Sequence, residues 1–219
     1  MNYQYLLLDR EFPLATITLN RPEKRNALST ALRNEIQKCL KELDEDEEIS
    51  VVIITGNGTA FCSGFDLTEL RTEEQKRFEV QEDSVEHYHR SLANFPKPLI
   101  AAINGPAFAG GFDLALFCDI RIAGESASFA HPEIKFGVPA MYAALKEIVG
   151  SGFARDLCLT GRSIDATESY RIGLVSQVVP DDQLIEKAKT LARLVAESPL
   201  HNLKRMKKMI IELSVNSEI

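Results

Sequence analysis

The chain has 219 residues, of which 45% are apolar and 26% charged, the composition of an ordinary globular protein with one domain. This composition excludes disordered, collagen-like and disulfide-scaffold proteins, and no apolar run approaches the roughly 18 residues of a membrane-spanning helix. The formal net charge of −7 argues against nucleic acid as a partner. From these properties we expect a protein that neither spans a membrane nor binds a polyanion.

The N-terminal segment and the cysteines point to an intracellular protein. Three leucines at residues 6–8 have no basic region before them and are followed at once by Asp9 and Arg10, so we expect no signal peptide and a cytoplasmic location. The four cysteines are well separated and lie in no C-x-x-C pattern. They are therefore expected to be reduced and buried, and no metal site is predicted.

The N-terminal part of the chain is predicted to begin with strands. Residues 5–8 and 15–19 are short β-rich runs, which predict an antiparallel hairpin with a longer connecting loop. Ser29 is a candidate N-cap for a helix with one buried face. The β-branched run 51–55 predicts a strand that is buried on both faces in a parallel sheet.

The middle of the chain repeats a pattern of strand, helix and strand. A highly charged helical region at about 68–94 is followed by a buried strand at 99–103. A short buried helix at 110–117 then leads to a strand at 119–123. These units predict an α/β fold.

The last part of the chain is predicted to be mostly helical, with a soft boundary near residues 195–199. The helices are expected at 141–149, 152–160, 165–171, 181–197 and 199–214, with a strand at 174–179. In the last helix the apolar residues Leu203, Met206, Ile210 and Leu213 are expected to face inward, and the basic cluster 204–208 to face solvent. We accordingly divide the chain into a core of residues 1–197 and a short C-terminal helical segment of residues 198–219.

Two glycine-bearing loops carry the strongest chemical signal. The first spans 56–67 and the second spans 105–119, and each follows a buried strand. Because the carboxyl ends of neighbouring parallel strands meet at one crevice, backbone amides from both loops could converge there on an oxyanion. Asp113 lies in an otherwise apolar helix, where an unpaired carboxylate is costly, so it needs a structural partner or a chemical role. Close packing alone is the other explanation for the glycines.

Five segments, taken together, resemble the enoyl-CoA hydratase/isomerase (crotonase) family in order and spacing, from about residue 3 to about residue 212. They are residues 20–28, 60–67, 105–119, 129–137 and 159–175. The resemblance implies a crotonase-like spiral of ββα units, here with a shortened C-terminal helical region. It also implies an acyl-CoA thioester substrate, no cofactor apart from the coenzyme A of that substrate, and a homotrimer or a dimer of trimers.

The same resemblance implies roles for individual residues. The backbone amides of Phe65 and Gly110 would hold the thioester oxygen as it becomes an enolate. Asp113 and Glu133 occupy the positions of two glutamates that flank the enoyl group in hydratases of the family, and hydration needs such an acid and base pair. The positions that match the coenzyme A-binding loops are Arg25, Ala27, Leu28, Ser63, Asp66 and Leu67. We therefore expect hydration of a 2-enoyl-CoA.

Departures from the family pattern keep other reactions open. Asp113 is one methylene shorter than glutamate, and a misplacement on the order of 1 Å can cost about 10²-fold in rate. Δ3–Δ2 isomerisation, decarboxylation and hydrolysis by the same enolate are the alternatives among enzymes. A catalytically weak CoA-binding protein is the alternative outside them.

Several further side chains have two readings. Residues 139–143 stand where members of the family usually have two glycines, and here Met141 and Tyr142 either narrow the acyl pocket or pack in the core. His131, two residues before Glu133, has either a functional role or holds its loop in place. His87 and His89 lie on the charged helical segment, where we expect solvated or loosely packed side chains.

Overall fold

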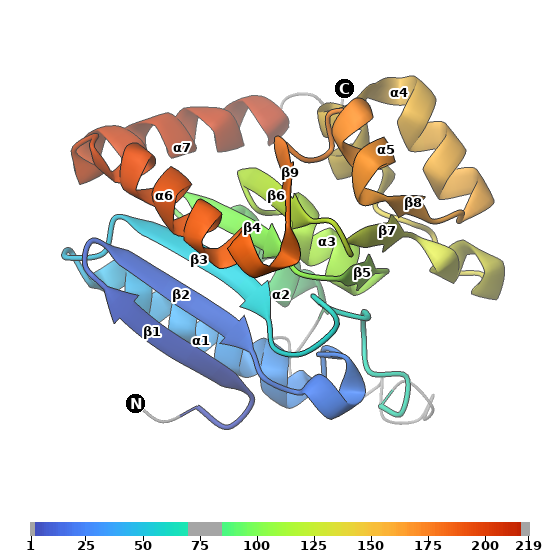
Figure 1. The fold of residues 1–219 in the computed structure, drawn as a ribbon, viewed down its shortest axis with the longest axis horizontal. Coiled ribbons are helices and arrows are strands. Elements are labelled where there is room, and N and C mark those ends of the chain that lie inside the picture. The colour runs from blue at the N-terminus through green and yellow to red at the C-terminus, as the bar shows by residue number, and fades with distance from the viewer. Residues whose placement is uncertain (1–2, 70–84, 216–219) are drawn as a thin grey trace.

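A six-stranded sheet forms the centre of the computed structural model, which describes residues 3–69 and 85–215 (Figure 1). Its strands, in spatial order, are β1 (Leu6–Glu11), β2 (Leu14–Leu19), β3 (Val51–Gly56), β4 (Leu99–Ile103), β6 (Ile120–Gly124) and β9 (Gln177–Val179). β1 and β2 are antiparallel, and each later pair of neighbours is parallel. The prediction of an antiparallel hairpin followed by parallel strands is therefore confirmed. The hairpin loop is shorter than predicted, because pairing with β2 extends β1 to Glu11.

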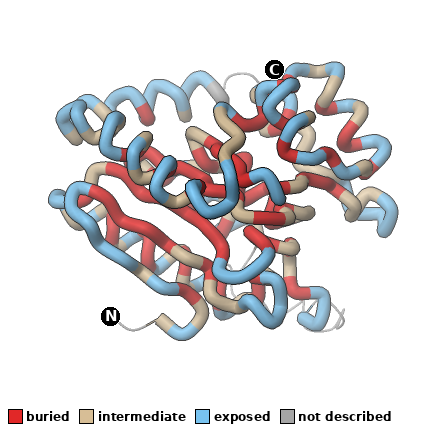
Figure 2. The backbone as a smooth tube through the Cα atoms, in the orientation of Figure 1, coloured by how far each residue is buried: buried red, intermediate tan, exposed pale blue. Residues whose placement is uncertain are grey.

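Helices cover both faces of this sheet. Val51 and Ile53 share one apolar cluster with α6 (Leu184–Ala196), whereas Val52 and Ile54 share the other with α1 (Thr30–Glu45). Successive side chains of a strand point to opposite faces, so a continuous apolar strand needs a helix on each side. Figure 2 shows the central strands buried and the outer turns of the helices exposed. The Ser29 hydroxyl accepts a hydrogen bond from the Leu32 amide at 3.2 Å, so the predicted N-cap is confirmed.

A second, three-stranded sheet was not predicted. It is formed by β5 (Pro106–Phe108), β7 (Ser128–Ala130) and β8 (Ile164–Asp165) in the order β5-β7-β8. Strands of two or three residues are too short to show an alternating pattern, so only their pairing with distant segments identifies them. This small sheet holds the second glycine-bearing loop beside the segment that carries Glu133.

The remaining helices largely follow the predictions. They are α2 (Val85–Ala93), α3 (Gly110–Leu116), α4 (Tyr142–Thr160), α5 (Ala166–Arg171) and α7 (Leu200–Val215), with 3-10 turns η1 (Pro22–Lys24), η4 (Pro132–Phe136) and η5 (Asp181–Gln183). Of the predicted helical region 68–94, residues 70–84 lie outside the described residues. Gly150, at φ 77° and ψ 165°, interrupts α4 where two helices were predicted. The predicted strand 174–179 is shorter and begins at Gln177. No helix within the described ranges is both long and apolar enough to cross a bilayer.

The orientation predicted for the last helix is wrong for three of its four apolar residues and for Lys207. Met206, Ile210 and Leu213 on α7 are 55%, 43% and 67% exposed. Lys207 is instead buried, and its ammonium lies 2.5 Å from the Asp119 carboxylate. This ion pair ties α7 to the segment before β6. Leu203 is partly buried, and Arg205 and Lys208 of the basic cluster are exposed as predicted.

Candidate active site

The first glycine-bearing loop lies between two other segments that fix its path. The Cys62 amide donates to Pro106 O at 3.1 Å, and the Phe108 amide donates to Cys62 O at 3.0 Å, so this loop pairs with β5. On its other side the Leu28 amide donates to Gly64 O at 2.8 Å. The predicted convergence of the two loops at the ends of β3 and β4 is therefore confirmed.

Glycine is required where the two loops meet. Gly64 has φ +98°, and a Cβ there would lie 2.9 Å from Phe108 O and 3.3 Å from Gly110 N. A Cβ on Gly110 would lie 2.5 Å from the Phe65 ring. A side chain at Gly64 would therefore press on the backbone of Phe108 and Gly110, and one at Gly110 would displace the Phe65 ring.

The amides of Phe65 and Gly110 are available to a ligand. Phe65 pairs with Leu28 in a parallel bridge whose hydrogen bonds use the Gly64 carbonyl and the Asp66 amide, so the Phe65 N–H points to the opposite side. Gly110 is the first residue of α3, and a first-turn amide has no partner within its helix. Within the described part of the chain, neither amide donates a hydrogen bond. Two such donors can stabilise an oxyanion.

The two predicted acids come together with a histidine between them. The Ala109 amide donates to Ala130 O at 2.9 Å, which joins the start of α3 to the end of β7. Asp113 on α3 and Glu133 on η4 consequently meet at His131, whose Nδ1 lies 2.8 Å from Glu133 Oε1 and 3.9 Å from Asp113 Oδ1. His131 was predicted only as a residue with two possible roles. Its position within the carboxylate pair depends on the pairing of β5 with β7, which the sequence does not display.

Burial sets the protonation of Asp113. Asp113 is 7% exposed, and burial of its carboxyl group raises the pKa from 3.8 to about 7. The His131 side chain opposes this shift, and the nearby Glu133 carboxylate adds to it. A carboxyl group with this pKa can carry a proton near neutral pH and act as a general acid. In the described structure Asp113 Oδ1, Glu133 Oε2 and His131 Nε2 are buried without a hydrogen-bond partner. Buried polar atoms of this kind are expected to meet a water molecule or a ligand.

The predicted coenzyme A-binding residues divide into two groups. Arg25 is exposed just after η1, and its carbonyl accepts a hydrogen bond from the Ser63 amide at 3.0 Å, so these two residues lie together. Ala27 is partly exposed and Leu67 is 71% exposed. Leu28 is fully buried in the core. Arg25 is thus the cationic group in this set that a phosphate could reach.

Asp66 has structural partners. Its carboxylate accepts hydrogen bonds from the Arg21 guanidinium at 3.1 Å and from the Thr68 hydroxyl at 2.7 Å, and these contacts lower its pKa. Asn26 was missed by the sequence analysis. Its buried amide donates to Asn57 O and Ala60 O, each at 2.9 Å. Together these side chains hold the first glycine-bearing loop in shape.

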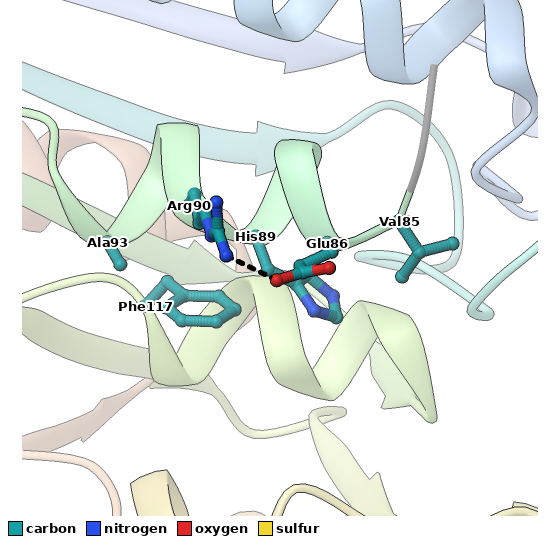
Figure 3. Close-up of a pocket in the computed structure, with 6 residues that line it drawn as sticks. All are labelled: Val85, Glu86, His89, Arg90, Ala93 and Phe117. Atoms are coloured by element: carbon teal, nitrogen blue, oxygen red, sulfur yellow. Dashed lines mark hydrogen bonds and ion pairs between the residues drawn. The ribbon is translucent and has the colours of Figure 1, made fainter. Parts of the chain in front are cut away.

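A shallow cavity of about 490 Å³ lies between α2 and the end of α3 (Figure 3). It is lined by Val85, Glu86, His89, Arg90, Ala93 and Phe117. The His89 ring packs 5.9 Å from the Phe65 ring and 5.2 Å from the Phe117 ring, and burial lowers its pKa to about 4. His89 is therefore a neutral, packed side chain close to the oxyanion loops, whereas His87 is exposed as predicted.

One further sequence hypothesis, on Tyr142, has a structural outcome. Tyr142 is partly buried against the main apolar cluster, which supports the core-packing alternative for this residue. Among the described residues, no three His, Cys, Asp or Glu side chains converge as metal ligands would.

Comparisons with known proteins show which family the chain resembles in sequence and in fold. The family model for enoyl-CoA hydratase/isomerase matches residues 9–218. A probable enoyl-CoA hydratase of Mycobacterium tuberculosis (strain CDC 1551 / Oshkosh) is 40% identical over 200 residues, which cover 90% of this chain and 77% of that protein. The crystal structure of an enoyl-CoA hydratase from Bacillus anthracis superposes with a TM-score of 0.89 at 38% identity, covering 94% of this chain and 82% of that one. A monofunctional enoyl CoA isomerase from M. smegmatis superposes with a TM-score of 0.80 at 32% identity, covering 96% and 93%.

Proposed function

The chain belongs to the enoyl-CoA hydratase/isomerase family, and from this premise we propose that it is an enzyme that adds water to the double bond of a 2-enoyl-CoA. The observation that carries the proposal is the meeting of Asp113 and Glu133 at one buried nitrogen of His131. Water addition needs a base and an acid at neighbouring carbon atoms, and this site supplies two carboxyl groups.

The proposed reaction uses one carboxyl group in each protonation state. The thioester oxygen lies between the amides of Phe65 and Gly110. Glu133 takes a proton from water as the water oxygen attacks Cβ, and the electron pair of the double bond moves toward the thioester oxygen to form an enolate. Asp113 then delivers its proton to Cα, and the proton held by Glu133 returns to Asp113 before the next turnover. The burial that raises the pKa of Asp113 to about 7 supports its role as the acid.

Isomerisation of a 3-enoyl-CoA is the second candidate function. It is favoured by the short side chain at Asp113 and by the likeness to an enoyl CoA isomerase over 93% of that chain. An isomerase can move one proton between Cα and Cγ with a single base, so it makes a smaller demand on Asp113.

Direct assays of the two reactions test the proposal. A hydratase removes the enoyl-thioester absorbance of crotonyl-CoA, whereas an isomerase creates such absorbance from a 3-enoyl-CoA. In a hydratase, Asp113→Asn and Glu133→Gln should each abolish water addition, because residues that act as a unit show non-additive losses. In an isomerase only Glu133→Gln should be severe. Near-wild-type turnover of both substrates in both variants would overturn the acid and base assignment.

The length of the acidic side chain provides a sharper comparison. Asp113→Glu restores the longer acid expected in hydratases of the family. A gain in crotonyl-CoA hydration would mean that the native aspartate suits another reaction. A loss would mean that the pocket is built around the shorter acid, which supports hydration by the native pair.

The assembly and the cellular location are further parts of the proposal. We propose a trimer or a dimer of trimers, with residues 139–179 supplying much of the contact, and the exposed apolar side of α7 supports self-association. A stable monomer in light scattering at micromolar concentration would refute it. The four cysteines are free and buried, which supports a reducing compartment such as the cytoplasm.

A further inference from the structure

His131 is held rigidly between the two carboxyl groups. Its side chain is fully buried, and its ring stacks on Phe112 with centroids 4.5 Å apart and an interplanar angle of 24°. Its backbone position is set by the end of β7, whose last residue, Ala130, accepts the hydrogen bond from the Ala109 amide. The imidazole therefore has little freedom to leave the acids.

The hydrogen bonds of the imidazole assign its tautomer. Nδ1 lies 2.8 Å from Glu133 Oε1, whereas Nε2 is buried with no partner among the described residues. A proton on Nε2 would have no acceptor among the described residues, and an unpaired buried donor is destabilising. A proton on Nδ1 is instead shared with a carboxylate. The neutral Nδ1–H tautomer is thus the one that this environment favours.

This arrangement distinguishes the two oxygens of Glu133. Oε1 accepts the imidazole N–H, whereas Oε2 is buried and has no partner in the described part of the chain. The donor therefore holds the carboxylate in one orientation. Oε2 is then the oxygen that is left to take a proton from water.

We propose that His131 is the positioning residue of this site, which donates its Nδ1–H to Glu133 Oε1 and thereby holds Glu133 with Oε2 free for the reacting water. This inference rests on the proposed function, because it assumes that Glu133 is the base. It assigns His131 no contact with substrate and no proton transfer of its own. Only Glu133 receives this hydrogen bond, since Asp113 lies 3.9 Å from the same nitrogen and outside hydrogen-bond range.

The other ionisable groups around the imidazole leave this assignment in place. Asp113 faces it from α3 and Glu133 from η4, and the thiols of Cys62 and Cys158 interact with these carboxyl groups. Burial raises the pKa of Cys62 to about 12 and also raises that of Cys158. Both thiols are therefore neutral at pH 7. The charge beside His131 is governed by the two carboxyl groups.

Two substitutions separate positioning from simple packing. His131→Leu keeps an apolar side chain against Phe112 and removes the donor. His131→Asn removes the ring but keeps an N–H near the position of Nδ1. We expect kcat to fall about 10- to 100-fold in His131→Leu with little change in KM, because misplacing a reacting group by about 1 Å can cost 10²-fold. In His131→Asn we expect recovery to within about threefold of the wild-type kcat.

The pH dependence gives a readout that packing alone would not move. A carboxylate that loses its donor binds a proton more readily, so the acidic limb of kcat/KM should move to higher pH in His131→Leu and return in His131→Asn. His201→Asn is the matched control, because His201 is exposed on α7, and its profile should equal that of the wild type. A wild-type kcat and pH profile in His131→Leu would overturn the proposal, as would an asparagine variant no better than the leucine variant.

A nitrogen-15 NMR measurement tests the tautomer independently of turnover. The imidazole signals lost in His131→Asn identify His131, and the wild-type protein should show a protonated Nδ1 that shifts in Glu133→Gln. A signal for protonated Nε2 and bare Nδ1 would refute the positioning role. If the wild-type protein hydrates no enoyl-CoA while the Nδ1–H signal is present, the proposed function fails and the hydrogen bond stands, so the two failures are distinguishable.

Discussion

Replacing Asp113 with asparagine should stabilise the protein progressively as the pH rises, while it removes hydration activity. The carboxyl group is buried, and its pKa is raised from 3.8 to about 7 in the folded protein. The folded state therefore binds this proton more tightly than the unfolded state. The stability linked to Asp113 is fully present below pH 4 and is lost as the pH rises through 7. An asparagine does not titrate, so the variant does not lose this part of the free energy of unfolding as the pH rises.

The size of the effect follows from the shift. A change of one pKa unit corresponds to about 1.4 kcal/mol, so the full shift is worth about 4 kcal/mol. About 2.5 kcal/mol of this stability is lost between pH 5 and pH 8, because the Asp113 carboxyl group is already ionised at pH 5 in the unfolded chain but not in the folded protein. The free energy of unfolding of Asp113→Asn, relative to the wild type, should increase by that amount over this range.

Urea denaturation of both proteins at pH 5 and pH 8 measures this difference. The control is Asp182→Asn, which removes an exposed carboxylate and should change the free energy of unfolding by less than about 0.5 kcal/mol at either pH. Loss of the acid should also reduce kcat by about 10²- to 10⁴-fold. A relative stability of Asp113→Asn that is the same at both pH values would refute the argument that Asp113 is a buried, protonated acid.

Three further substitutions test other parts of the structure. Gly110→Pro removes one of the two oxyanion donors and should lower kcat by about 10²- to 10³-fold; a variant that is folded by circular dichroism and fully active would exclude the oxyanion assignment. Ala109 has φ 49° and ψ −127°, a conformation that favours glycine. Ala109→Gly should therefore raise the free energy of unfolding by about 1 kcal/mol and the melting temperature by about 2–4 °C. An unchanged melting temperature in calorimetry would contradict this strain. Lys207→Ala leaves Asp119 without its ammonium partner and should lower the free energy of unfolding, measured by urea denaturation, by about 2 kcal/mol. Lys208→Ala, at an exposed position, should lower it by less than about 0.5 kcal/mol. Equal decreases in the two variants would show that the buried ion pair is unimportant.

Much of the sheet and of the site could be predicted from the sequence, because local patterns carry the relevant physics. The continuous apolar run 51–55 identifies a strand covered on both faces, and Ser29 identifies a helix start, since each depends only on neighbouring residues. The position of the two glycine-bearing loops after neighbouring strands likewise predicted that their backbone amides converge, and the family resemblance identified Phe65 and Gly110 within them. Once the strands are parallel neighbours, their carboxyl ends must meet.

Other features depend on contacts between distant segments. The strands β5, β7 and β8 have no local pattern, and their pairing is what brings His131 between Asp113 and Glu133. The outward apolar side of α7 has the same origin. The helical periodicity of α7 defines two faces but does not determine which of them packs against the protein. The ion pair with Asp119, a residue distant in the sequence, buries Lys207. Periodicity and capping are properties of neighbouring residues, whereas the environment of a side chain is set by whatever the rest of the chain packs against it.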